Sequence, residues 1–158
     1  MPLCLVMESY LLACTTGTWC VDTEATNHVC NSLQGFQETR RLAKREIYLL
    51  MGDTSRVAAV AMGVVTLHFG EDKKLVLSDC LYVPSVRRNL VSVSCLSCNE
   101  YSSLFNKDYI FVKYGDDIIC RGKLSDNLYL LEPISLQINS HESNYKRNEI
   151  FPVNQTHL

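Results

Sequence analysis

The sequence predicts an all-β domain, and two observations support this prediction. Short apolar runs recur along the chain, and clusters of Gly, Asp, Asn and Ser separate them about every eight to twelve residues. This alternation of short strands and tight turns is typical of an all-β barrel or sandwich. The chain has 158 residues, 47% of them hydrophobic, which is enough to bury one core without disulfides or a bound metal.

The individual strands follow from these apolar runs and from the turns between them. The turn segments are Gly52-Asp53-Thr54-Ser55, Gly70-Glu71-Asp72-Lys73 and Gly115-Asp116-Asp117, whose compositions favour hairpins. Residues 31–45 are polar and weakly patterned, and we expect a connecting loop with a helical turn there. We expect strands at residues 19–22, 46–51, 56–61, 63–69, 74–77, 80–83, 101–105, 109–114, 118–121 and 128–131.

The composition divides the chain into three parts. Residues 1–18 form an N-terminal flank, residues 19–133 form the strand-rich domain, and residues 134–158 form a polar linker. The apolar residues of the flank are interrupted by Glu8 and are not preceded by Lys or Arg, so they lack the pattern of a signal peptide. No run approaches the roughly eighteen apolar residues that span a bilayer. We expect a cytoplasmic protein without membrane contact.

The charge of the chain points away from nucleic acid. The net charge is −2 and the isoelectric point is near 6.1, so there is no general attraction to polyanions. Basic residues occur as the isolated pairs Arg40-Arg41, Lys73-Lys74 and Arg87-Arg88, without aromatic residues between them. Such pairs are expected to be solvated surface, and direct nucleic-acid binding is not expected.

The eight cysteines are irregularly spaced, and several lie in strand-like apolar runs. We expect reduced thiols in a cytosolic protein, several of them buried as small hydrophobic side chains. Cys95 and Cys98 form a C-x-x-C pair that could indicate a metal or redox site. Zinc requires about four ligands, usually from two such pairs, and no second pair or βαβ pattern is present. We therefore expect a short helix with one of these cysteines facing the core, and no metal or cofactor.

The most informative segment is WCVDTEATNHVC, residues 19–30. A short apolar strand, Trp19-Cys20-Val21, leads directly into Asp22 and Thr23, after which the chain turns away. A carboxylate on a tight loop after a buried strand, followed by a hydroxyl residue, is what half of an aspartic-protease site requires. Two such loops from two subunits can share one proton between like charges and activate a water molecule.

A second segment, LYVPSVRRNLVSVSCL at residues 81–96, strengthens this interpretation. Together, the two segments resemble the protease region of Pol polyproteins from copia-type LTR retrotransposons of plants. In that family the loop reads Asp-Ser/Thr-Gly-Ala, which matches Asp22, Thr23 and Ala25, and a Leu-Tyr-Val-Pro…Asn-Leu run follows about sixty residues later. The resemblance covers residues 19–133. It implies a retropepsin-like closed β-barrel, which is one subunit of a two-fold homodimer.

The resemblance also implies a role for each loop residue. Asp22 would be the catalytic aspartate, and Thr23 would supply the hydroxyl that ties the two active-site loops together across the dimer. The family has glycine where this chain has Glu24. Glycine allows the backbone to fold against the carboxylate, so that its amide supports the charged form. Glutamate adds a Cβ, a long side chain and a second negative charge, and from this we predict an inactive domain.

The flap that closes such a site is expected at one of two places, Gly52-Asp53-Thr54-Ser55 or Ala61-Met62-Gly63. The family commonly shows Asp-Gly-Ser and Gly-Xaa-Gly there, so each place has lost one glycine. With Glu24, three glycines are replaced at positions where positive φ or flexibility would matter.

Three hypotheses for function remain open. The leading one is a retrotransposon-derived aspartic endopeptidase domain that is inactive as written, whose intact relatives would cut their own Gag-Pol polyprotein without a cofactor. The second is a non-enzymatic β-barrel module for dimerisation or scaffolding, and the third is a small cysteine-based metal protein. We expect the chain to be a degenerate fragment that stops where a pre-integrase module would begin.

Overall fold

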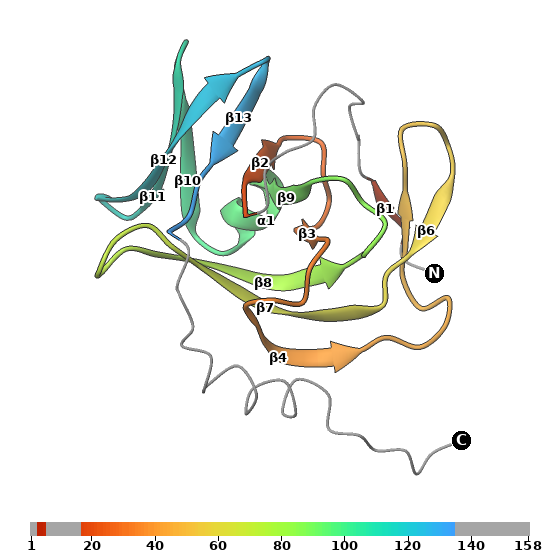
Figure 1. Ribbon diagram of the computed structural model, residues 1–158. Helices are drawn as coiled ribbons and strands as arrows, with labels where there is room; N and C mark the ends of the chain where they lie inside the picture. Colours follow the sequence, from red (N-terminus) through yellow and green to blue (C-terminus); the bar gives the residue numbers. More distant parts are fainter. Residues whose placement is uncertain (1–2, 6–16, 135–158) are drawn as a thin grey trace.

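The computed structural model describes residues 3–5 and 17–134, and strands dominate it (Figure 1). The all-β class is therefore confirmed. The helix of the described residues is α1 (Val93–Cys98), and no helix among these residues has the length and apolar character needed to cross a membrane. The strands are β1 (Leu3–Leu5), β2 (Trp19–Asp22), β3 (Val29–Cys30), β4 (Phe36–Arg41), β5 (Tyr48–Leu50), β6 (Arg56–Ala58), β7 (Ala61–His68), β8 (Lys74–Tyr82), β9 (Asn89–Ser92), β10 (Tyr101–Phe105), β11 (Tyr109–Tyr114), β12 (Asp117–Ser125) and β13 (Leu128–Leu131).

The strands form a large sheet and a small one. The large sheet has ten strands in the order β10-β11-β12-β13-β2-β9-β3-β8-β7-β4, and the small sheet has the order β1-β5-β6. The expected closed barrel is wrong in this respect, because the two outermost strands of the large sheet, β10 and β4, do not pair with each other. The sheet remains open at both edges.

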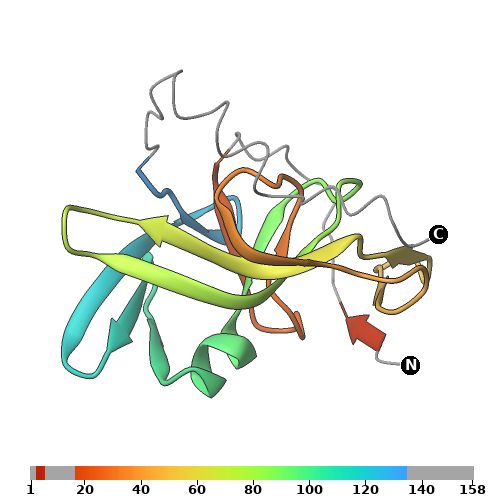
Figure 2. The same cartoon turned by 90° about the horizontal axis from the view of Figure 1, so that it is seen from below.

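The large sheet curls back on itself without closing. Strand β12 approaches β8, and the hydroxyl of Tyr101 in β10 accepts a hydrogen bond from the backbone N–H of Val76 in β8 (3.3 Å). After β13, the N–H of Ile134 donates to the carbonyl of His68 at the end of β7 (2.7 Å). Figure 2 shows the β7–β8 hairpin crossing the molecule from the β10–β13 strands to the β5–β6 hairpin. One hydrophobic core lies inside the curl, and a second lies between β2, β9 and the β5–β6 region.

In strands β7 and β11, burial alternates along the chain. In β7, every second residue from Ala61 to Leu67 is buried while the residues between them are partly exposed. In β11, the buried residues are Ile110 and Val112. This period of two places one side chain in the core and the next outside. The less buried Met62, Val64 and Phe111 are apolar as well, so the sequence shows these strands as apolar runs.

Strand β4 is a correction, because residues 31–45 were expected to form a loop with a helical turn. Phe36 is buried, but no other residue of β4 is, and the strand pairs with β7 only discontinuously. The register shifts between Gln37 and Arg40, and Glu38 lies in the left-handed region with φ +49°. A short edge strand with a bulge and charged residues carries no apolar alternation from which it could be recognised.

Two further boundaries differ from expectation. Residues 74–77 and 80–83 were expected as separate strands, but β8 runs continuously through them, with a bulge where Asp79 adopts φ +52°. Residues 3–5 of the expected flank form β1, which pairs in parallel with β5. The rest of the flank up to residue 16 and the expected linker from residue 135 lie outside the described residues.

Gly63 generates a prediction about stability. A Cβ at this position would lie 2.9 Å from the carbonyl oxygen of Gln37 and 3.0 Å from the Phe36 ring, where β4 crosses closely over β7. The first contact is with backbone and cannot be relieved by rotating a side chain. Gly63→Ala is expected to lower the free energy of unfolding by about 1–3 kcal/mol, measured by urea denaturation. Gly70→Ala is the matched control, since a Cβ there meets only ordinary contacts, and equal losses for the two variants would contradict this reading.

Candidate active-site loop and cleft

The candidate loop begins where β2 ends, inside the large sheet. Strand β2 pairs with β13 on one side and in parallel with β9 on the other, with Asp22 opposite Ser92. This places Asp22 beside the segment Asn89–Val93. The first three residues of β2 are buried and Asp22 is half-buried, so the strand brings a carboxylate from the core to the surface.

The carboxylate of Asp22 is held by the backbone of its own loop. Its Oδ1 accepts hydrogen bonds from the N–H of Glu24 (2.7 Å) and of Ala25 (3.1 Å). The expectation that Glu24 would prevent this support is therefore wrong, because residue 24 is not among the non-glycine residues with positive φ and its amide reaches the carboxylate. The side chains of Thr23 and Glu24 are exposed, and Ala25 is buried beneath them.

Ser92 fixes this loop from the neighbouring strand. Its hydroxyl donates to the carbonyl of Ala25 (2.6 Å) and accepts from the N–H of Cys95 (3.2 Å), which makes it the N-cap of α1. Its backbone N–H donates to Nδ1 of the buried His28 (3.0 Å). One fully buried serine therefore joins both ends of the loop to β9 and to the start of the helix.

A cleft of about 470 Å³ opens beside the loop. Asp22, Thr23 and Glu24 form part of its wall. The remaining wall includes Phe105 of β10 and Tyr129 of β13, whose rings meet edge to face with centroids 5.2 Å apart. The structure therefore brings two of the three predicted site residues, Asp22 and Thr23, to one cleft, while Ala25 supports the loop from below.

Arg88 is a cleft residue that sequence reasoning missed. Arg87 is exposed, as expected for a solvated basic pair, but Arg88 is only 3% exposed and lines the cleft. The expectation of a solvated pair is wrong for Arg88, because the chain enters β9 there and all four residues of β9 are buried. Its guanidinium adds a positive charge to a cleft that also contains two acidic residues.

Asn89 gives the Arg-Asn-Leu segment a structural role. Its Oδ1 accepts from the N–H of Asn31 (3.0 Å), and its Nδ2 donates to the carbonyl of Thr18 (3.4 Å). The side chain of Asn31 in turn donates to the carbonyl of Val86 (3.2 Å). These bonds join Asn89, at the start of β9, to the residues next to both neighbouring strands, β2 and β3, so the Asn89 side chain has a structural role and not a chemical one.

The cysteines of residues 17–134 are free thiols: Cys20, Cys30, Cys80, Cys95, Cys98 and Cys120. Burial raises the pKa of Cys30 to about 11 and of Cys120 to about 12, which keeps these thiols protonated and unreactive.

The expected short helix is confirmed, but neither of its cysteines faces the core. That position belongs to Leu96, while Cys98 is exposed and the Cys95 thiol donates to the carbonyl of Thr26 (3.2 Å). No three His, Cys, Asp or Glu side chains gather as a metal site in residues 3–5 and 17–134.

The two flap candidates differ in structure. Ala61-Met62-Gly63 lies within β7 and cannot be a hairpin tip, whereas Gly52–Ser55 is the turn of the β5–β6 hairpin. That hairpin lies on the other side of the β2–β9 pair from β12 and β13 (Figure 1), and its turn does not line the cleft. Of the three replaced glycines, only that at Thr54 falls on a positive φ, +68°.

Thr54 generates a prediction about the hairpin. A β-branched residue in the left-handed region is strained by about 1–2 kcal/mol, and glycine at this position would relieve that strain. The extra conformational freedom of glycine in the unfolded chain offsets part of this gain in stability. Thr54→Gly is therefore expected to raise the free energy of unfolding by about 0.5–1 kcal/mol, measured by urea denaturation. Thr54→Ala retains a Cβ at the same φ and serves as the control. A loss of stability in Thr54→Gly would show that the turn is not strained.

His28 generates a prediction about pH. Burial lowers its pKa from 6.5 to about 4, because the ring is 1% exposed and its Nδ1 must remain unprotonated to accept from Ser92. The unfolded chain binds the proton more readily than the folded chain. The stability that the buried, neutral His28 contributes is therefore present above pH 6.5 and is lost as pH falls towards 4. The loss attributable to His28 is about 3 kcal/mol.

The measurement is the free energy of unfolding as a function of pH for the unchanged chain and for His28→Gln. The variant should lose the steep decline between pH 6.5 and 4 that is specific to His28, whereas His68→Gln should retain it. Should His28→Gln fail to fold, titration of the His28 ring signals by NMR replaces it. A ring that protonates near pH 6.5 in the folded chain would refute the assignment.

Comparisons with known proteins identify the family of the chain. Residues 19–101 match the family described as Pol polyprotein, beta-barrel domain. The chain is also 30% identical, over 111 residues, to a Retrovirus-related Pol polyprotein from transposon TNT 1-94 of Nicotiana tabacum. That alignment covers 70% of this chain and 8% of the longer relative. No solved structure matches the chain. The family match covers the strands that carry Asp22 and Ser92, and the chain belongs to the Pol polyprotein β-barrel domain family.

Proposed function

We propose that this domain is one half of a dimeric, copia-type aspartic endopeptidase of a retrotransposon Pol polyprotein, and that the charge of Glu24 suppresses its activity. The observation that supports this most directly is the carboxylate of Asp22, held by two backbone N–H groups at the rim of a cleft. A carboxylate fixed in this way is oriented before substrate arrives, which is what general acid–base chemistry requires. The free thiols support a reducing compartment such as the cytoplasm.

The chemistry would need two copies of the loop. Two Asp22 carboxyl groups, one from each subunit of a homodimer, would share one proton. The charged carboxylate would take a proton from water, whose oxygen attacks the peptide carbonyl carbon, while the protonated partner gives its proton to the carbonyl oxygen. As the C–N bond breaks, the aspartate that holds the water's proton gives it to the leaving amine, and a hydroxyl of the tetrahedral intermediate returns its proton to the other aspartate as the carbonyl re-forms. These transfers regenerate the shared-proton pair. In this arrangement the exposed Thr23 hydroxyl faces the partner loop, and the substrate is a Gag-Pol polyprotein.

We attribute the suppressed activity to the charge of Glu24 and not, as the sequence suggested, to the loop backbone as well. The loop backbone tolerates Glu24, since the amide of that residue still donates to Asp22. The remaining obstacle is charge, because a dimer would bring two Glu24 carboxylates to a site that already holds two aspartates. Like charges at close range shift each other's pKa by about 1–3 units and oppose the approach of the loops.

A second function, a dimerisation or scaffold module without catalysis, is supported by a different observation. The contacts of Ser92 and Asn89 that build the loop region are structural and do not depend on the Asp22 carboxylate. A domain that persists for folding and association alone would keep these contacts. The oligomeric state of such a domain would not depend on which residue occupies position 22.

Substitution of Glu24 tests the leading proposal. The unchanged chain should show no pepstatin-sensitive cleavage of a Gag-Pol-like peptide at mildly acidic pH. Glu24→Gln removes the charge and keeps the size of the side chain, and it should give pepstatin-sensitive cleavage about tenfold or more above the assay background, the factor that corresponds to one pKa unit. Glu24→Gly should do the same and no more, because the backbone is already in place. Combination with Thr54→Gly tests whether the β5–β6 turn also limits closure.

The controls separate the two functions. Adding Asp22→Ala to Glu24→Gln should abolish all cleavage. Sedimentation of the unchanged, Glu24→Gln and Asp22→Ala chains should show tighter dimers in both variants if the carboxylates repel each other. Equal association of all three chains, with no cleavage by any of them, would favour the scaffold function. Asp22-dependent cleavage by the unchanged chain at the rate of Glu24→Gln would disprove suppression by charge.

A further inference from the structure

The outer face of strands β10–β12 combines aromatic and basic side chains on an open sheet surface. Strand pairing places Phe111 opposite Leu104 and Arg121, and Tyr109 opposite Lys123. Directly paired residues share one face of a sheet. The alternate residues of β11, Ile110 and Val112, are buried in the core, so this set faces outward. We refer to Leu104, Tyr109, Phe111, Lys113, Arg121 and Lys123 as the outer face.

The aromatic rings of the outer face form a continuous surface. The rings of Tyr109 and Phe111 have centroids 6.2 Å apart, and the guanidinium carbon of Arg121 lies 4.6 Å from the centre of the Tyr109 ring. This cation–π contact places the Arg121 guanidinium over the Tyr109 ring. Leu104 extends the apolar surface towards the edge strand and is 54% exposed.

The charges of the outer face have one sign. Lys113, Arg121 and Lys123 contribute three cations, and no carboxylate lies among the six residues. The acids of these strands lie at the turns: Asp116 and Asp117 at one end, and Asp108 at the other. A chain with a net charge of −2 thus presents a local basic surface.

We propose that the outer face binds single-stranded nucleic acid. Sheet surfaces of this composition accept unpaired bases on their aromatic rings while the flanking cations neutralise the phosphates. Stacking requires bases that are not engaged in a duplex, so a single strand is the ligand that uses both features. This site is separate from the Asp22 cleft and does not depend on the proposed catalytic function.

The outer face cannot be recognised from the sequence, because the residues that form it are not adjacent in the chain. Basic pairs and their immediate neighbours were the signal considered, and they lack aromatic residues. The cations and rings of the outer face come from three strands and meet only through antiparallel pairing. The expectation that no nucleic acid is bound rested on that linear pattern.

Fluorescence anisotropy of labelled oligonucleotides tests the proposal on the full chain. The probes are an oligouridine RNA and an oligothymidine DNA of about twelve nucleotides, together with a duplex of similar length. Both single strands should bind saturably at about 50 mM salt, with the duplex weaker, and the affinity should fall as salt increases.

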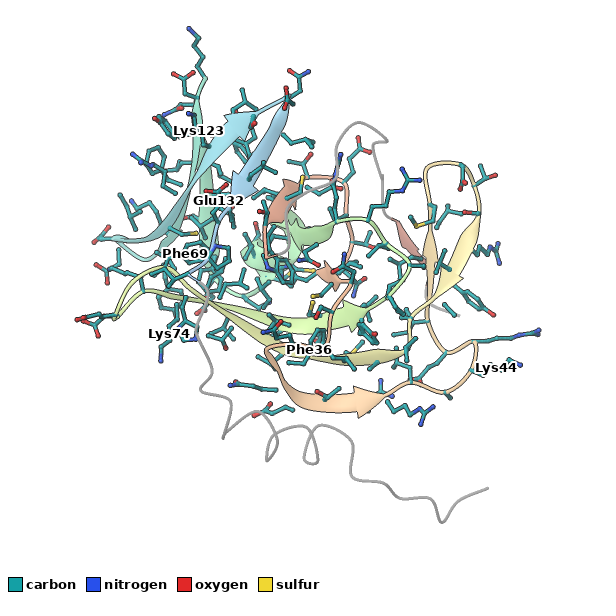
Figure 3. The ribbon with its side chains drawn as sticks, viewed as in Figure 1. Phe36, Lys44, Phe69, Lys74, Lys123 and Glu132 are labelled. Carbon is teal, nitrogen blue, oxygen red and sulfur yellow. The ribbon has the colours of Figure 1, made fainter. Side chains whose placement is uncertain are left out.

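The variants have a matched control. Arg121→Gln with Lys123→Gln should weaken binding by about tenfold or more and reduce the slope of log affinity against log salt by about 1.4, or 0.7 for each lost phosphate contact. The control, Lys44→Gln with Lys74→Gln, removes the same charge from exposed residues that lie away from Lys123 (Figure 3), and it should leave affinity nearly unchanged. Phe111→Leu keeps an apolar side chain and removes stacking, so it should weaken binding by about fivefold or more with the salt slope unchanged.

Circular dichroism of each variant verifies that the fold is retained. Three outcomes would overturn the proposal: no saturable binding of either single strand, equal losses in the test and control pairs, or preference for the duplex. Binding that survives Phe111→Leu unchanged would also overturn it, since phosphate attraction alone would then account for the affinity.

Discussion

The parallel pairing of β2 with β9 is the constraint on which the rest of the structure depends. It brings Asp22 opposite Ser92 in the middle of a ten-stranded sheet, between strands that are far apart in the chain. Every contact that shapes the candidate loop starts from this register: the Ser92 hydroxyl reaches Ala25, and the Ser92 amide reaches His28. A shift of one residue would turn the side chains of β9 to the opposite face and separate all these groups.

The elements predicted from sequence are mainly apolar runs bounded by turn residues. Strands β2, β7 and β11 are such runs, although burial alternates only in β7 and β11 among these three. Strand β4 was missed because only Phe36 is buried in it, so its pairing with β7 is decided by tertiary contact and not by its own pattern. The open edges of the sheet could not be predicted for the same reason, because closure depends on whether β4 and β10 meet.

The residues of the candidate site also divide into those predicted from a local sequence signal and those that depend on tertiary contacts. The position of Asp22 follows from a short apolar strand that ends in a polar turn, which is a local signal. The buried environment of Arg88 and the hydrogen bond of His28 depend on how β9 threads through the sheet, and a linear sequence does not report that path. The effect of Glu24 was misjudged in one respect, since the glycine of related loops is not required for φ in this loop. In the proposed dimer, what glutamate changes is the charge presented to the partner loop.

The central position of β2 has a consequence for synthesis of the chain. Trp19 pairs with Asn89 on one side and with Leu131 on the other, so the first strand of the large sheet is completed by the last one. Contacts between such distant segments slow folding, because a long loop must close before they form. At about 5–20 residues per second, a ribosome needs on the order of ten seconds to make the stretch between these partners. The edge of β2 that faces β13 stays unpaired throughout that interval, even after β9 has been made and can cover the other edge.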